Sequence, residues 1–514
     1  MIKTPEAIAI TRHIAESNSH TVVDGLAGTG KTTVFADAFT ALDPTIYPEI
    51  WVTSHNTDIV KAISARLPVE MYVKGIHAVG YGSLHFNFRP STTRNYVVPN
   101  KYEYILRDIL PEYIKDNKSQ HLWSNSLQQL WDLCRTNMVN PKDVVALKKL
   151  AQHYTLECPY TLVQASEILQ LLEKRGKKEV NYRVDFTDMM WLPVVLGLSP
   201  TRKFKHAIAD EVQDFTPLHM QLFLQFSDGA RRHIIGDYNQ AIYSFMGASG
   251  DAINILNGIL SATDIGCVRL PLSVCWRCPT SHLDLVREII PHIKNAPNAK
   301  VGAVNRTTKH QLLKQHPPKP GSVCITRTNR PGIDMCLTLT SMGIPSRMAG
   351  KDINRFLIDL FDKTCKSPMD FQRGYSATLD KYIDSKVSRL SEEEGNDMAI
   401  ASILDRGESL RQLYYSADEQ NITNPHEFRK YISDMFVGED EMDDNNVVYC
   451  STVHKFKGRE ADHIYILNPE NIRHPKAKTK LEKQQEINID YIARSRSKDT
   501  LTYVSEGQKV ESIL

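Results

Sequence analysis

The stretch Gly25-Leu26-Ala27-Gly28-Thr29-Gly30-Lys31-Thr32 has the spacing G-x-x-x-x-G-K-T. Residues 21–23 before it predict a buried strand, and residues 33–42 after it predict a helix. Between a strand and a helix, the glycines let backbone N–H groups converge on phosphate oxygens, and the helix N-terminus adds partial positive charge. Lys31 is then expected to reach the β- and γ-phosphates, and Thr32 to bind Mg²⁺. The alternative is a glycine-rich turn with a coincidental lysine, but the flanking elements favour a nucleoside triphosphate site.

Composition limits the class of protein. The chain has 514 residues, of which 41% are hydrophobic and 24% charged, so it is long enough for several globular domains. Lysine and arginine number 62 against 60 acidic residues, so a nucleic-acid partner must bind in a local groove. The sequence lacks both a signal-peptide pattern and a run of about 18 apolar residues, which predicts no membrane partner.

The nine cysteines are scattered, and only Cys275 and Cys278 form a C-x-x-C pair. This pattern predicts reduced thiols and a cytoplasmic location rather than a disulfide framework. A single C-x-x-C lacks the second pair of ligands of a structural zinc site. Buried thiols are therefore favoured over metal binding.

Adjacent acids follow a further predicted strand. Residues 206–209 are apolar and lead directly into Asp210 and Glu211, and a strand-loop-helix unit at residues 50–67 indicates that a parallel sheet is being built. Beside a phosphate loop, Asp210 is expected to hold Mg²⁺, and Glu211 to orient or deprotonate the attacking water. The alternative is that the two acids only cap a helix.

A third predicted strand at residues 233–235 leads to Gln240, Tyr243 and Phe245. Gln240 is placed to sense the γ-phosphate. The two aromatic side chains offer faces on which a nucleobase can stack, worth about 1–3 kcal/mol per base. The alternative is a pair of core aromatics beside a turn.

Five segments follow the phosphate loop in a fixed order. They are residues 210–214 (DEVQD), 236–248 (GDYNQAIYSFMGA), 276–279 (WRCP), 452–460 (TVHKFKGRE) and 491–498 (YIARSRSK). Together they resemble the superfamily 1 DNA helicases of the UvrD/Rep type, over nearly the whole chain. Several motifs in the right order are far more specific than any one of them.

The resemblance implies an α/β fold with two RecA-like parallel-sheet motor domains and mainly helical insertions, with ATP and Mg²⁺ as cofactors. Arg277 and Arg496 would reach the γ-phosphate as arginine fingers, beside the catalytic residues Lys31, Asp210, Glu211 and Gln240. The metal would meet Thr32 and Asp210. ATP would contact Gly25, Ala27, Gly28, Thr29, Gly30, Lys31, Thr32, Thr33, Trp276 and Glu460. The resemblance also implies single-stranded DNA bound by Thr53, Asn56, His77, Tyr243, Phe245, Thr452 and His454.

Domain boundaries follow from the same order of motifs. We expect a first RecA-like domain at residues 1–85 and 186–270, interrupted by an insertion at 86–185. A second domain is expected at 271–350 and 446–514, interrupted by a small accessory insertion at 351–445. Two basic runs, at 174–178 and 473–480, are either phosphate contacts or solvated loops.

The leading hypothesis is an ATP-dependent translocase and helicase that moves 3′-to-5′ on single-stranded DNA and unwinds duplex DNA. One alternative is a strand-stimulated ATPase that remodels protein–nucleic acid complexes without unwinding. Another is a phosphate-loop kinase, against which the second-domain arginines argue. The compact size suits a phage or mobile-element helicase acting in a host cytoplasm. The sequence does not define protein partners, the choice of DNA over RNA, or the pathway, be it replication, repair or recombination.

Overall fold

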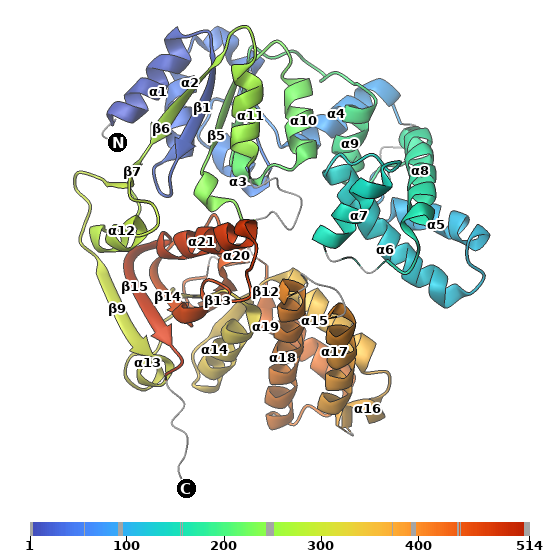
Figure 1. Ribbon diagram of the computed structural model, residues 1–514. Coiled ribbons are helices and arrows are strands. Elements are labelled where there is room, and N and C mark those ends of the chain that lie inside the picture. The colour runs from blue at the N-terminus through green and yellow to red at the C-terminus, as the bar shows by residue number, and fades with distance from the viewer. Residues whose placement is uncertain are drawn as a thin grey trace. The chain divides into compact units, whose positions relative to one another are not determined.

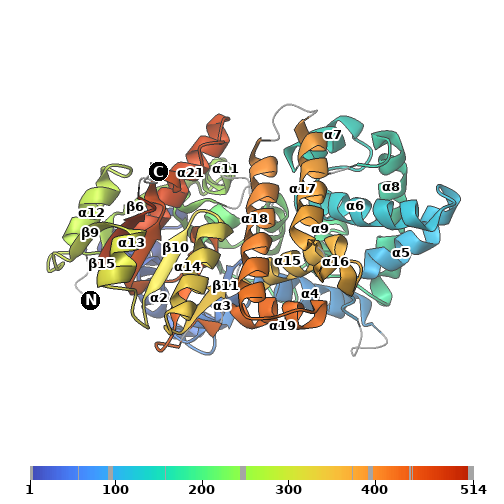
Figure 2. The same ribbon diagram turned by 90° about the horizontal axis from the view of Figure 1, so that it is seen from below.

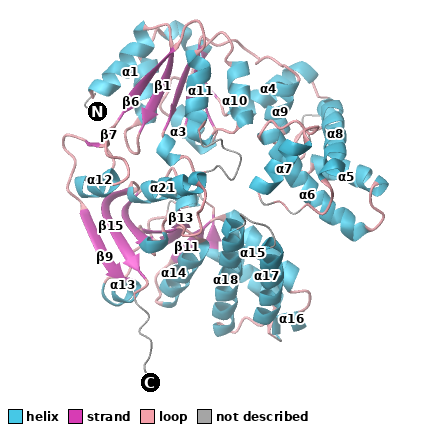
Figure 3. Ribbon diagram, in the orientation of Figure 1, coloured by secondary structure: helices cyan, strands magenta, loops and turns pink. Residues whose placement is uncertain are grey.

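The computed structural model describes two units of the chain. The residues described are 4–55, 57–90, 96–154, 156, 158–242, 251–372, 374–391, 397–438, 441–442 and 444–507. The units are Met1–Ser273 and Val274–Leu514, and each is described by itself. Both have strands covered by helices (Figure 3).

The first unit is built on a six-stranded parallel sheet with the strand order β3-β2-β4-β5-β1-β6. Its strands are β1 (His20–Gly25), β2 (Ile50–Ser54), β3 (Tyr72–Val73), β4 (His206–Asp210), β5 (Arg231–Gly236) and β6 (Cys267–Leu272). Since β4, β5 and β1 are neighbours, the segments that follow their carboxyl ends meet at one edge of the sheet. This is the edge at which open parallel sheets bind ligands.

Alternate residues of these strands pack into two different cores. Val23, Ile50 and Ile208 pack with α1 (Pro5–Glu16), α2 (Lys31–Thr40) and α3 (Thr57–Ser64). Val22, Trp51 and Ala207 belong to a larger core that includes α10 (Pro217–Phe226) and α11 (Ala252–Ser261). In Figure 1, α1 and α2 lie on one side of β1 and β6, and α11 on the other. Burial on both faces explains the continuous apolar runs of the strands.

The larger core continues into a set of helices between β3 and β4. These are α4 (Ile76–Phe88), α5 (Lys101–Ile109), α6 (Asn117–Thr136), α7 (Val144–His153), α8 (Leu162–Lys178) and α9 (Asp188–Val195). The basic run at residues 174–178 is the last turn of α8 and not a loop. Two of its four charges are paired there, Lys177 with Glu173 at 2.7 Å and Arg175 with Asp108 at 2.9 Å.

The second unit contains a seven-stranded parallel sheet of order β12-β11-β13-β10-β14-β15-β9. Its strands are β9 (Ala303–Thr308), β10 (Val323–Thr326), β11 (Ser346–Ala349), β12 (Phe436–Val437), β13 (Val448–Thr452), β14 (Ala461–Leu467) and β15 (Ser497–Ser505). The short strands β7 (Val274–Cys275) and β8 (Lys294–Asn295) pair separately. The sheet's helices are α12 (Thr280–Arg287), α13 (Lys309–Gln315), α14 (Asn329–Ser341), α20 (Val453–Phe456) and α21 (Lys480–Arg494).

Between β11 and β12 the chain is helical. The helices are α15 (Lys351–Thr364), α16 (Pro368–Gln372), α17 (Tyr375–Ser391), α18 (Asp397–Glu419) and α19 (Pro425–Met435). Helices α17 and α18 run side by side (Figure 2). Phe361, Leu410 and Phe428 of this group share one core with Met348 and Cys450 of the sheet.

The predicted α/β class with two parallel sheets and helical additions is confirmed. No helix within the described ranges is long and apolar enough to cross a membrane.

Candidate functional site

The G-x-x-x-x-G-K-T stretch forms a tight loop between β1 and α2. Gly28 and Gly30 have φ angles of 68° and 76°, in the left-handed region that favours glycine, and Gly30 caps α2. The Thr29 hydroxyl donates to the carbonyl oxygen of Leu26 at 2.8 Å, and Leu26 N donates to the carbonyl oxygen of Leu272 at 3.0 Å. The loop is therefore closed on itself and anchored to the neighbouring strand β6.

Lys31 folds back over this loop. A Cβ atom at Gly25 would lie 2.5 Å from Lys31 Cγ, so the bare glycine leaves room for the lysine stem. Lys31 Nζ lies 3.9 Å from Glu211 Oε1. Within the loop Ala27 is buried, and in the first turn of α2 the Thr33 hydroxyl accepts from Arg66 at 3.3 Å.

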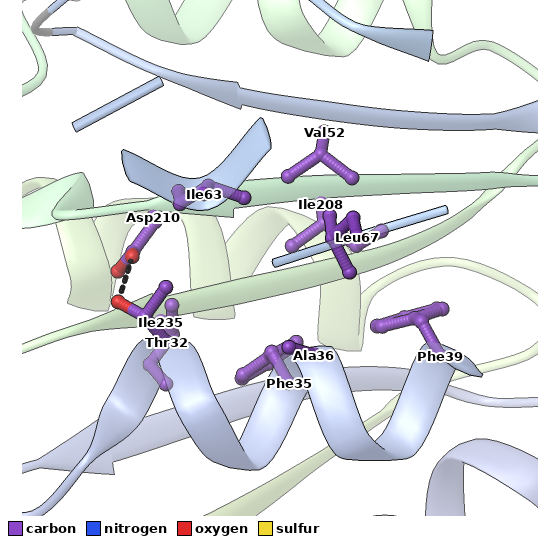
Figure 4. Close-up of a pocket in the computed structure, with 10 residues that line it drawn as sticks. All are labelled: Thr32, Phe35, Ala36, Phe39, Val52, Ile63, Leu67, Ile208, Asp210 and Ile235. Atoms are coloured by element: carbon purple, nitrogen blue, oxygen red, sulfur yellow. Dashed lines mark hydrogen bonds between the residues drawn. The ribbon is translucent and has the colours of Figure 1, made fainter. Parts of the chain in front are cut away.

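Thr32 and Asp210, predicted to share a metal ion, are in direct contact. The Thr32 hydroxyl donates to Asp210 Oδ2 at 2.8 Å, the dashed line in Figure 4. Burial and the neighbouring Glu211 raise the pKa of Asp210 to about 6. A hydroxyl and a carboxylate are hard oxygen donors of the kind that Mg²⁺ prefers, so the residues fit this ion. The cavity of about 20 Å³ beside them is a packing gap under α2 that has room for about one water molecule.

Glu211 is connected to Gln240 through two residues, Gln213 and Asp237, whose roles were not predicted from the sequence. Gln213 Nε2 donates to Glu211 Oε2, while Gln213 Oε1 accepts from Asp237 N at 3.1 Å. Gln240 Nε2 donates to Asp237 Oδ2 at 2.7 Å. Together these bonds join the loops after β4 and β5. The D-E-x-Q-D pattern contained the signal for Gln213, but not the identity of its partner.

Two predicted DNA contacts of the first unit, Thr53 and His77, lie near the carboxyl end of β2. Thr53 is 1% exposed, and His77 lies in the first turn of α4 with its ring 5.8 Å from that of His219. Burial and the nearby His55 lower the pKa of His77. His55 Nε2 lies 3.9 Å from Asp214 Oδ2, which connects this group to the acidic segment. Asn56, Tyr243 and Phe245 lie outside the described residues.

The second unit brings together Arg277, Glu460 and Arg496. Arg277 Nε donates to Glu460 Oε2, and Arg277 also donates to the carbonyl oxygen of Ser495 at 3.3 Å. Arg496 donates to the carbonyl oxygen of Arg459 at 3.3 Å. Both arginines are thus tied to the segment that precedes β14.

Two further predicted site residues of the second unit are Trp276, next to Arg277 in the chain, and Thr452, which caps α20. Trp276 is half-buried between the buried thiols Cys275 and Cys278. Thr452 ends β13 and caps α20, accepting from Lys455 N at 3.4 Å. Burial, with Arg327 and Lys457 nearby, lowers the pKa of His454 to about 3, so its imidazole is neutral at physiological pH.

Two family models match the chain. Residues 8–258 match the UvrD/REP helicase N-terminal domain, and residues 136–507 match the UvrD-like helicase C-terminal domain. No curated protein matches the chain. The second match alone covers more than half of the sequence, and both agree with the two parallel sheets and the phosphate loop. The chain therefore belongs to the UvrD/Rep-type superfamily 1 helicases.

Proposed function

We propose that this protein hydrolyses ATP to move along single-stranded DNA in the 3′-to-5′ direction and to unwind duplex DNA. The observation that carries the proposal is the pairing of the two motifs at one edge of the first sheet. Thr32 contacts Asp210 at 2.8 Å, and Lys31 approaches Glu211 at 3.9 Å. A phosphate loop beside two ordered carboxylates is the arrangement that phosphoryl transfer to water requires.

We assign the roles within the first unit from this geometry. Lys31 would bind the terminal phosphates, in exchange for its contact with Glu211, and Glu211 would then orient or deprotonate the attacking water. Thr32 and Asp210 would hold Mg²⁺, which offsets the negative charge of the phosphates. Gln240 would sense the γ-phosphate. Its link to Glu211 through Asp237 and Gln213 supports that role.

We assign the roles within the second unit from the resemblance and from local contacts. Arg277 and Arg496 would stabilise charge on the transferring phosphoryl group, an effect worth about 10³–10⁵ in turnover for an arginine finger. Trp276 would stack on the base of ATP. Glu460 would bind the ribose, and its hydrogen bond with Arg277 supports a common site for these two residues.

Along the DNA, the proposed contacts are Thr53, Asn56, His77, Tyr243, Phe245, Thr452 and His454. Neutral imidazoles at His77 and His454 suit hydrogen bonding and stacking rather than ion pairing with phosphates. Such contacts to backbone and base faces carry little sequence preference. A cytoplasmic location and a place in replication or repair stay predictions.

Steady-state ATP hydrolysis with and without single-stranded DNA tests the motor. We expect strong stimulation by the strand, abolished by Lys31→Ala and by Arg496→Ala, but retained by the exposed control variant Lys118→Ala. A rate of ATP hydrolysis that changes neither with DNA nor with Arg496→Ala would contradict a two-unit motor.

Strand displacement on tailed duplexes tests direction and unwinding. We expect opening of a duplex with a 3′ single-stranded tail and none with a 5′ tail. Opening of only the 5′-tailed duplex would reverse the assignment. Displacement of a bound protein from single strands without duplex opening would instead identify a remodelling ATPase.

A further inference from the structure

A run of basic residues lies between η8 (Pro469–Asn471) and α21, and the motor function proposed above uses none of them. Residues 473–480 are Arg-His-Pro-Lys-Ala-Lys-Thr-Lys, and α21 begins at Lys480. Two interpretations of this run follow from the sequence, phosphate contacts or a solvated loop. The contacts that its residues make favour the first.

The backbone of this basic loop, residues 473–480, is fixed to the helix that follows it. His474 N donates to Glu486 Oε2 at 2.8 Å. The N–H groups of Lys478 and Thr479 each donate to Glu482 Oε2 at 2.9 Å. The Thr479 hydroxyl in turn accepts from Glu482 N at 3.2 Å, which completes a capping box. A loop ordered in this way loses little further freedom when it binds a ligand.

The cations of the basic loop and of the first turn of α21 fall into two groups. Arg473 pairs with Asp490 at 2.8 Å, and Lys478 pairs with Asp397 of α18 at 2.5 Å. The members of the second group are exposed and form no ion pair within the described ranges of the chain, and they are Lys476, Lys480 and Lys483. These three ammonium groups therefore leave a positive potential at this surface.

Two of the three lysines begin α21. Lys480 is its first residue and Lys483 its fourth, and residues three apart on a helix are neighbours on its surface. The N-terminus of a helix carries partial positive charge, which favours anions and disfavours cations. Glu482, the acidic residue of this turn, accepts from the backbone of the loop. The lysines and the helix end thus act together on an approaching anion, as they do at helix N-termini that bind phosphate.

The basic loop is connected to a residue that we assign to the DNA. Glu486 accepts from His474 N and also from Arg327, whose Nε lies 2.7 Å from Glu486 Oε2. Burial and, next, Arg327 lower the pKa of His454, so the arginine is close to that imidazole. Helix α20, which contains His454, packs against α21 (Figure 1). The loop therefore continues the part of the second unit to which a DNA contact is assigned.

We propose that Lys476, Lys480 and Lys483 bind backbone phosphates of DNA, in addition to the contacts assigned to Thr452 and His454. The proposal rests on the proposed DNA motor for its choice of anion, because DNA is the extended polyanion that such a motor holds. Ammonium groups that meet phosphates release counterions and read no base. The phosphates belong either to the single strand on which the motor moves or to the duplex that it opens, with the same chemistry in both cases.

The salt dependence of DNA binding tests the proposal and separates the two sources. Fluorescence anisotropy of a labelled oligothymidylate and of a labelled blunt duplex gives the binding constant of the full-length protein between about 50 and 200 mM KCl. Each phosphate contact contributes about 0.7 to the slope of log K against log salt for a single strand and about 0.9 for a duplex. We expect the variant with Lys476→Gln, Lys480→Gln and Lys483→Gln together to lower the slope by about 2 with the single strand or by about 3 with the duplex.

Matched variants separate phosphate contacts from other effects. Lys478→Gln removes the same charge from the same loop, but Lys478 is paired with Asp397, so the slope should stay nearly unchanged. Replacing the three free lysines by arginine keeps their charge and should keep the full slope. All three side chains are exposed, and urea titration shows whether each variant is as stable as the unaltered protein.

A lower slope with the single strand identifies the strand on which the motor moves, and a lower slope with the duplex alone identifies the duplex. The proposal is overturned if the triple glutamine variant keeps both slopes, or if Lys478→Gln lowers the slope by as much as one third of the triple change. Normal DNA binding with unchanged slopes overturns this inference alone, whereas an unaltered protein that binds neither probe overturns the motor proposal as well.

Discussion

Glu211 has a backbone conformation that few residues other than glycine adopt. Its φ angle is 54°, and this left-handed conformation costs of order 1–3 kcal/mol at a residue other than glycine. The Glu211 N–H donates to Asp210 Oδ1 at 2.8 Å, and Gln213 donates to its carboxylate. These bonds hold the strained residue and aim its carboxylate toward Lys31. Backbone strain of this kind is typical of residues at functional sites, which agrees with the catalytic role proposed for Glu211.

Gly236 determines whether Gln213 can hold that carboxylate. A Cβ atom at Gly236 would lie 2.4 Å from Gln213 Oε1 and 2.8 Å from Ile253 Cδ1. We expect Gly236→Ala to displace Gln213 and to lower the DNA-stimulated kcat about 10–100-fold, because small displacements of catalytic groups cost this much. Stopped-flow or steady-state ATPase measurements read the effect.

The matched control is Gly258→Ala in α11, where an added Cβ meets nothing within 4 Å. It should leave kcat unchanged and stabilise the fold by about 0.5–1 kcal/mol, as alanine does in a helix. An unchanged kcat in Gly236→Ala would mean that Gln213 does not position Glu211.

Two histidines, His206 of β4 and His233 of β5, lie side by side in the first sheet. His206 Nδ1 lies 3.0 Å from His233 Nε2, and the rings stack with centroids 5.3 Å apart. Burial, with Arg231 and Lys205 nearby, lowers the pKa of His206 to about 4, and burial also lowers that of His233. The folded state therefore favours neutral rings, whereas the unfolded chain takes up protons near pH 6.5.

The stability that this pair contributes is complete above about pH 6.5 and is lost as the pH falls toward about 4. For His206 alone the loss approaches about 3 kcal/mol. Urea unfolding between about pH 7 and pH 4.5 measures it. We expect His206→Asn to reduce the pH slope of the free energy of unfolding by nearly one proton, about 1.4 kcal/mol per pH unit. The exposed control His121→Gln should keep the full slope, and an equal slope in both variants would contradict the assignment.

Contacts between single residues are best predicted from the sequence when the residues lie directly at the end of a predicted strand or at the start of a predicted helix. Thr32 contacts Asp210 and Lys31 approaches Glu211, because Lys31 and Thr32 begin α2 and the two acids lie at the carboxyl end of β4. The link through Asp237 was not predicted, because it depends on which strands are neighbours in the sheet. Periodicity identifies a strand but not its neighbour, and here the order of β4, β5 and β1 decides the contact.

At the scale of the elements, buried charges gather where α5, α6 and α9 meet. Lys101 of α5 is fully buried and donates to Asp188 at 2.6 Å and to the carbonyl oxygen of Gly176 at 3.0 Å. Arg135 of α6 meets the same carboxylate at 2.8 Å. The group ties α5, α6, α8 and α9 together. Charges buried this deeply are tolerated only when they are paired and hydrogen-bonded.

Removing one member of this group leaves a buried carboxylate with fewer partners. We expect Lys101→Met to lower the free energy of unfolding by about 3–5 kcal/mol. Denaturant titration measures the loss. Arg175→Met breaks the exposed pair with Asp108, whose side chains are 44% and 64% exposed, and should cost about 0–1 kcal/mol. Equal losses in the two variants would show that burial does not decide the effect.

The same group explains why the basic run at residues 174–178 continues α8 and does not form the solvated loop that was one of its two predicted interpretations. Composition indicated a solvated stretch, but Gly176 lies against Tyr102, with an added Cβ only 2.3 Å from its hydroxyl. The glycine is needed there for close helix packing and does not end the helix. Only the tertiary contact distinguishes the two roles of a glycine in a charged run.

At the scale of the whole molecule, each hydrophobic core formed by the described residues belongs to a single unit. Two clusters lie within the first unit, and one cluster lies in the second, where it joins the sheet to the helices α15 to α19. Each unit can therefore lose its packing without the other. We expect two transitions in scanning calorimetry, the usual behaviour of a chain with separate cores.

Variants in the separate cores identify the two transitions. Phe223→Ala and Leu410→Ala each remove a fully buried side chain, the first from the first unit and the second from the second unit. Each should lower one transition only, by the equivalent of about 2–5 kcal/mol. A single transition lowered equally by both variants would mean that the units unfold together.

The effect of bound nucleotide on the two transitions tests whether residues of both units contact ATP. A non-hydrolysable ATP analogue at about 100 times its Kd should stabilise the first unit by about 2.7 kcal/mol, because the phosphate loop lies there. If Arg277 and Arg496 also contact the nucleotide, the transition of the second unit rises as well. Arg496→Ala should remove most of that second rise and keep the first. If the analogue does not raise the unfolding temperature of the second unit in the unaltered protein, the arginine-finger role is excluded, because a ligand stabilises only the unit that binds it.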